Sequence, residues 1–180
     1  VVPEVYEDEG DVWSFNTCGF GGKLEAFKHE ESFCTERGNI ISTVRTRSVF
    51  RKSSLEQHIT VYPGEGYVDI RFRANWEDPH TVLKYTVRQN NLKPDDKIYA
   101  GVPGGKAVRT LDGFEYPLTE TLSYGGISVA SGNIFAYDTL KDDGTFRLTV
   151  LRNPVCGDLR MEKALSPDED YRYCLLYTSP

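Results

Sequence analysis

Apolar and polar residues alternate along several stretches of this chain, and the clearest of them runs from Tyr67 to Trp76. One side of this stretch carries Val68, Ile70, Phe72, Ala74 and Trp76, and the other carries Asp69, Arg71, Arg73 and Asn75. Successive side chains of a β-strand point to opposite faces of its sheet, so the pattern predicts a strand with one apolar and one polar face. The pattern alone leaves open whether solvent, a sugar or another domain meets the polar face.

The same period of two recurs on both sides of that stretch. Residues 39–50, 55–62 and 81–87 alternate in the same way and predict further strands. Pro63–Gly66 has the residues of a tight turn, because proline presets φ and glycine accepts a positive φ. These segments together predict an antiparallel meander of three or four strands.

The second half of the chain repeats this style with shorter segments. Residues 112–140 offer short strands divided by glycine, asparagine and aspartate. The Asp-Gly turn at 142–145 is a hairpin signal. The strand expected after it alternates at Phe146, Leu148 and Val150.

Helical patterns are short and confined to residues 53–58 and 167–173. The sequence therefore predicts an all-β fold, an antiparallel β-sandwich, built as one domain over residues 1–173.

Composition limits the function classes. Acidic residues outnumber basic ones by 27 to 21 in 180 residues, giving a net charge of −6, which argues against a nucleic-acid partner. No apolar run is long enough to cross a bilayer, so no membrane partner is expected. The chain starts without methionine, and we expect it to be an internal piece of a longer protein. The absence of glycosylation sequons and disulfide spacing favours the cytoplasm only slightly.

Residue spacing by itself predicts no active site. The four cysteines contain no C-x-x-C pair and are expected to be free or partly buried thiols, with a Cys18–Cys34 bridge as the alternative. The three histidines form no metal-binding pair. The acidic run Glu7–Asp11 lacks the ligand spacing of a calcium loop.

Several segments nevertheless resemble one known family, glycoside hydrolase family 38, the α-mannosidases. Tyr6–Trp13 resembles an Asp-x-x-Asp-x-Trp segment of its β region, residues 101–110 resemble a Gly-x-x-x-Arg segment ending at Arg109, and residues 146–155 resemble a Leu-Leu-Arg-Ser-Pro strand. Residues 53–87 resemble its most recognisable C-terminal stretch, with matches at Ser54, Leu55, Val68, Asp69, Trp76, Leu83 and Lys84. The resemblance covers Tyr6 to Tyr173.

This resemblance implies a retaining α-mannosidase whose zinc, zinc ligands and nucleophilic aspartate belong to an upstream domain absent from these 180 residues. The chain would then be a β-sandwich related in fold to galactose mutarotase. It would pack on its own upstream catalytic domain and help to enclose the α-mannoside substrate. The polar face of Tyr67–Trp76 would meet solvent or that domain.

The same resemblance provides four candidate substrate-binding residues. Asp11 and Trp13 lie in a segment similar to a family loop near the active site, and a Trp ring can stack on a sugar. The alternative is a buried Trp beside an Asp that caps a turn. Arg109 and Arg152 are further candidates, although arginines at strand ends are commonly solvated or ion-paired.

The sequence also departs from the family pattern. Ser14–Asn16 stand where a Gly-His pair is common, and residues 174–180 replace an expected strand, so we interpret them as a non-native tail. The main alternative function is a free-standing carbohydrate-binding sandwich with aromatic stacking surfaces. A mutarotase-like epimerase would need a His and Glu pair in a cleft, which the histidine spacing does not support.

Overall fold

The computed structural model describes residues 1–8, 10, 19–90, 96–140 and 144–154, and every regular element within them is a β-strand. The all-β prediction is confirmed. Among the described residues no helix has the length and apolar character needed to cross a membrane. The strands are β1 (Val2–Glu7), β2 (Lys28–Arg37), β3 (Ser42–Phe50), β4 (Ser53–Val61), β5 (Val68–Asn75), β6 (Thr81–Arg88), β7 (Ile98–Val102), β8 (Gly105–Arg109), β9 (Tyr116–Pro117), β10 (Thr121–Tyr124), β11 (Ile127–Ala130), β12 (Ala136–Thr139) and β13 (Thr145–Asn153).

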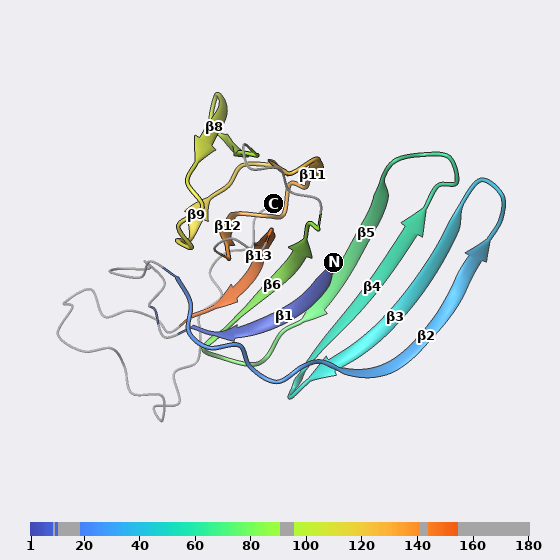
Figure 1. Cartoon of the computed structure of the whole chain (residues 1–180). Helices are drawn as coiled ribbons and strands as arrows, with labels where there is room; N and C mark the ends of the chain where they lie inside the picture. Colours follow the sequence, from blue (N-terminus) through green and yellow to red (C-terminus); the bar gives the residue numbers. More distant parts are fainter. Residues whose placement is uncertain (9, 11–18, 91–95, 141–143, 155–180) are drawn as a thin grey trace. The chain divides into compact units, whose positions relative to one another are not determined.

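The chain divides into two compact units (Figure 1). The sandwich unit contains the described residues of Val1–Leu24 and Pro79–Pro180, and the meander unit is Glu25–Asp78. The meander unit is an insertion between β1 and β6, which pair directly in antiparallel register from Val2 opposite Thr86 to Glu7 opposite Thr81.

The sandwich unit is built from two antiparallel sheets. One has the strand order β1-β6-β13-β12-β9 and the other β11-β10-β7-β8. Their facing sides are apolar: the ring of Tyr124 in β10 meets that of Phe146 in β13 edge-on, with centroids 6.3 Å apart. Leu122 and Leu148 are almost completely buried in the same core. The predicted antiparallel β-sandwich is therefore confirmed.

Strand β6 lies between β1 and β13 in the five-stranded sheet. This corrects the predicted meander, in which β6 would have paired with β5. Five consecutive residues, Thr81–Tyr85, are buried, as expected of a central strand covered on both faces. The chain leaves the meander just before β6 at His80, whose φ is +55°.

The meander unit is one antiparallel sheet in the order β2-β3-β4-β5 (Figure 1). The alternation predicted for β5 is present: Arg71, Arg73 and Asn75 are exposed, whereas Phe72 and Ala74 on the apolar side are partly buried. At one end of the apolar side, the rings of Phe50 and Trp76 stack at 5.9 Å and 4°, and Phe27 packs against both.

Two local predictions were wrong. Residues 53–58 are not helical but begin β4, because Ser53, Leu55 and Gln57 alternate into the buried side of the sheet. The alternation of β13 stops at Val150, where a bulge between Thr149 and Leu151 shifts its register against β6.

Two of the candidate site residues, Asp11 and Trp13, lie outside the described residues. The segment 155–180, which includes the expected tail, lies outside them as well.

Candidate functional site

The side of the five-stranded sheet that turns away from the apolar core carries a row of charged and polar residues. Lys84 in β6 lies opposite Glu4 in β1 and Thr149 in β13, and Arg147 in β13 lies opposite Asp138 in β12. We call these five residues the charged face. Residues two apart on a strand share a face of the sheet. The register between neighbouring strands then brings these residues side by side.

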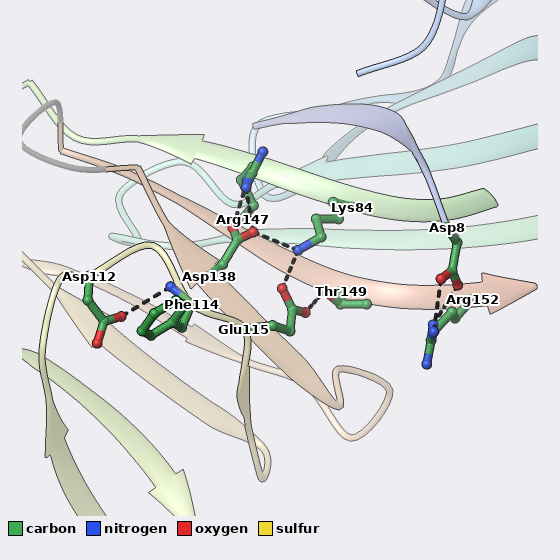
Figure 2. Close-up of polar contacts among 9 residues, drawn as sticks. All are labelled: Asp8, Lys84, Asp112, Phe114, Glu115, Asp138, Arg147, Thr149 and Arg152. Carbon is green, nitrogen blue, oxygen red and sulfur yellow. Dashed lines mark hydrogen bonds and ion pairs between the residues drawn. The ribbon is translucent and has the colours of Figure 1, made fainter. Parts of the chain in front are cut away.

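Lys84 is the centre of the charged face and has no exposed side-chain surface. Its ammonium group donates to Asp138 Oδ2 at 2.9 Å and to a carboxylate oxygen of Glu115 (Figure 2). It also lies 4.6 Å from the ring centre of Phe20. A buried ammonium group is tolerated only when anions and hydrogen bonds replace its hydration, and the two carboxylates meet that requirement.

Asp138 is shared between two cations. Its Oδ1 accepts from Arg147 Nε at 2.6 Å and its Oδ2 from a second nitrogen of the same guanidinium, while Lys84 approaches from the other side. Burial by itself would lower the pKa of Arg147, but the hydrogen bonds with Asp138 outweigh it and raise that pKa. Arg147 also lies over the ring of Tyr6, with its Cζ 4.6 Å from the ring centre.

Glu115 is the residue just before β9, and its side chain extends to the charged face. Its second oxygen accepts from the Thr149 hydroxyl group, as Figure 2 shows. Burial raises the pKa of Glu115, against the opposing effect of the Lys84 ammonium group. Two cations and two anions, Lys84, Arg147, Glu115 and Asp138, thus form a balanced network.

Arg152 joins the same face because of the bulge in β13. Thr149 pairs with Lys84, and after the extra residue Val150 the next pairs are Leu151 with Leu83 and Arg152 with Val82. Val82 and Lys84 share a side of β6, so the bulge turns Arg152 onto the side that Thr149 also occupies.

Asp8 and Phe20 both contact the Arg152 guanidinium. Its Nε and Nη2 donate to both oxygens of Asp8, at 2.5 and 2.8 Å, and Asp8 is 1% exposed. The ring of Phe20 lies 5.3 Å from its Cζ. Such a bidentate pair holds the planar guanidinium in one orientation.

A cavity of about 310 Å³ opens beside this arginine. Its lining combines two aromatic rings with an acidic and a basic side chain, and consists of Gly19, Phe20, Glu115, Pro117, Phe135, Ala136 and Arg152. Its volume is at the lower end of the range for small-molecule sites, and rings with a few fixed polar groups suit a hydroxylated ligand. It is the best candidate site in the described part of the chain.

Of the candidate residues predicted from the sequence, Arg109 and Arg152 lie in different places. Arg152 lines the cavity, whereas Arg109 at the end of β8 lies over the ring of Tyr116 and is not part of its lining. Asp11 and Trp13 lie outside the described residues.

Sequence reasoning missed Asp8, Glu115 and Asp138 as site residues. Lys84 was named as a match to the family pattern but was given no site role, although it is the one charged residue in the strand segment 81–87. Its acidic partners could not have been noticed, because they come from β12 and the segment before β9, far along the chain.

The residues present do not fit a zinc site. Within the described ranges no three His, Cys, Asp or Glu side chains gather closely enough to hold a metal ion. The carboxylates of the charged face are already engaged by lysine and arginine. No catalytic step through a metal follows from this part of the chain.

Comparison with known proteins identifies one family. Curated proteins give no significant match. The profile described as the glycosyl hydrolases family 38 C-terminal domain matches residues 2–160, which include both units and every residue of the candidate site. The chain therefore belongs to glycoside hydrolase family 38 and represents its C-terminal domain.

Proposed function

We propose that this chain is the C-terminal β domain of a zinc-dependent, retaining α-mannosidase that removes terminal α-D-mannosyl residues. Membership of family 38 supports a glycosidase context. The proposal assigns zinc, its ligands and the nucleophile to an upstream catalytic domain, which is the expected partner of this chain. The isolated chain is accordingly expected to be inactive.

Within that enzyme, the cavity beside Arg152 would form part of the wall of the sugar site. The observation that carries this role is the buried Asp8–Arg152 pair, which presents a fixed guanidinium at a cavity with aromatic lining. Preorganised donors favour binding because little side-chain freedom is lost when the ligand arrives. Phe20 and Phe135 would cover the apolar face of a sugar ring.

The test uses the full-length enzyme that contains this chain. Hydrolysis of an aryl α-mannoside should need zinc and stop after chelation, and an aryl α-glucoside should be a poor substrate. Activity of the 180 residues alone would contradict the upstream location of catalysis. Hydrolysis that survives complete removal of metal would contradict the zinc requirement.

The contribution of the cavity is tested by Arg152→Ala, which should raise KM by about tenfold or more, as expected for a lost charged hydrogen bond. Arg71→Ala is the matched control, since Arg71 is an exposed arginine of the meander unit that is ion-paired with Asp69 at 3.1 Å. Equal KM values for the two variants would remove Arg152 from the site.

A second candidate, a carbohydrate-binding module without catalysis, is favoured by the same cavity. It predicts saturable binding of mannosides to the isolated chain, with loss of binding in Phe135→Ala. Phe135 is suitable because the residue is 46% exposed and contributes to the cavity lining. Absence of binding by the isolated chain, together with activity of the full-length enzyme, would exclude this alternative.

A further inference from the structure

Arg109 is a half-buried cation that forms no ion pair within the described part of the chain. Its Nε is inaccessible to solvent and has no hydrogen-bond acceptor among the described residues. The one contact of its guanidinium there is with the ring of Tyr116, whose centre is 5.3 Å from Cζ. A buried N–H group without an acceptor is unfavourable, and more so when the group is charged.

A second polar group without a partner lies in the same region. Tyr137 in β12 has no exposed surface, and its hydroxyl group has no hydrogen-bond partner among the described residues. Tyr137 is directly opposite Tyr116 in the β12–β9 register, and the two rings are 6.1 Å apart. The Arg109 guanidinium and the Tyr137 ring therefore both neighbour Tyr116.

The hydroxyl group of Tyr137 is a neutral donor under ordinary conditions. Burial raises its pKa to about 12, and the Arg109 charge acts in the opposite direction on the same group. This electrostatic influence agrees with the placement of both residues beside Tyr116. Both groups can donate a hydrogen bond, and neither has an acceptor among the described residues.

The nearby acidic group is not that acceptor. Asp112 accepts from the hydroxyl groups of Tyr116 and Thr110 at 2.6 and 2.7 Å, and from the Phe114 amide at 3.1 Å (Figure 2). These three bonds fold the 110–116 loop on itself and hold the carboxylate there. Arg109 makes no ion pair with it.

We propose that Arg109 and Tyr137 form a binding site for an oxyanion, a carboxylate or phosphate group whose oxygen accepts from Arg109 Nε and the Tyr137 hydroxyl group. An anion both supplies the missing acceptor and neutralises the guanidinium, whereas a water molecule does only the first. The site is separate from the cavity beside Arg152. Tyr137 and Asp138 are consecutive in β12 and point to opposite faces, so the charged face lies on the other side of the sheet.

The test is a titration of the 180-residue chain with sodium phosphate and with sodium acetate, each at constant ionic strength maintained with sodium chloride. The readout is the NMR signal of the Arg109 Nε–H group, which reports an acceptor at that atom. At least one of the two anions should give a saturable shift, and the anion that binds more tightly identifies the phosphate or carboxylate class. No saturable shift with either anion would overturn the proposal.

Variants assign the binding to the two residues. Arg109→Gln should abolish saturable binding, measured by calorimetry, and Tyr137→Phe should weaken it by about tenfold, the loss expected for one hydrogen bond to a charged ligand. Lys106→Gln is the matched control, because Lys106 is an exposed cation on the same strand, β8. Equal weakening by Lys106→Gln would show that only general charge attraction operates, and would also overturn the site.

Discussion

Lys84 and Asp138 lie on strands that are not neighbours, yet their side chains meet across β13 with Nζ and Oδ2 2.9 Å apart. Their side chains are 0% and 1% exposed. Because neither charge can be hydrated in the folded chain, each depends on the other and on Glu115 and Arg147. The charged face is therefore a requirement for stability, and Glu115, which accepts from Lys84, also lines the cavity of the candidate site.

Replacement of Lys84 by methionine should lower the free energy of unfolding by about 3–5 kcal/mol, the effect expected when one partner of a buried ionic network is removed. Glu115 would lose its cation, while Asp138 would keep only Arg147. Urea unfolding measures the change. Lys106→Met, an exposed position, should alter stability by about 0.5 kcal/mol or less. Similar values for both variants would show that the buried network contributes nothing.

Glu115 should make the chain less stable as pH rises. Its pKa in the folded chain is raised by burial, so between its ordinary value of 4.5 and the folded value the folded state holds more protons than the unfolded state. Stability from this group is therefore fully present below pH 4.5 and declines above it. Glu115→Gln removes the titration, so wild type should lose stability relative to this variant from pH 4.5 towards neutrality.

Urea unfolding at a series of pH values tests this sign. Because both proteins share every other titrating group, the difference between their unfolding free energies isolates Glu115. A difference that grows in favour of wild type as pH rises would mean that the Lys84 ammonium group outweighs burial. The direction assigned to the pKa would then be wrong.

Strand positions were predictable where burial is one-sided. The alternation of Tyr67–Trp76 gave β5 and its faces correctly, because a sheet with one covered side selects for that pattern. Strand β2 was not predicted: Lys28–Arg37 is rich in charge and exposed at all 10 positions, as suits an edge strand, and such sequences carry no apolar signal. The insertion between β1 and β6 was also missed, because pairing of distant strands leaves no local trace.

The candidate site was predictable only in part. The family resemblance selected Arg152, and the structure places it at the cavity. Its orientation depends on the bulge at Val150, which shifts the residues after it to opposite faces and which simple alternation could not reveal. Asp8 and Glu115 were missed because their partners are 144 and 31 residues away in sequence.

The aromatic stack of the meander unit should be its main source of stability. Phe50 is 1% exposed and contacts the rings of Phe27 and Trp76. Phe50→Ala should therefore destabilise by about 3–5 kcal/mol, the usual effect of removing a buried aromatic side chain. Trp fluorescence during urea unfolding reports the change, since Trp76 is part of the stack. Phe33→Ala is the control, because Phe33 is 42% exposed, and an equal effect of the two variants would contradict the assignment.

The Asp8–Arg152 pair should survive removal of the bulge. Asp8→Ala in the wild-type chain should lower the free energy of unfolding by about 3–5 kcal/mol, because it removes the bidentate partner of a largely buried guanidinium. Deletion of Val150 removes the extra residue but leaves Leu151 opposite Leu83 and Arg152 opposite Val82, so Arg152 should keep its face and still reach Asp8. The two changes should then be close to additive: Asp8→Ala should cost about as much after Val150 is deleted as before. Urea unfolding of the wild type, both single variants and the double variant completes the cycle, and strong non-additivity would show that the bulge itself positions Arg152 for Asp8.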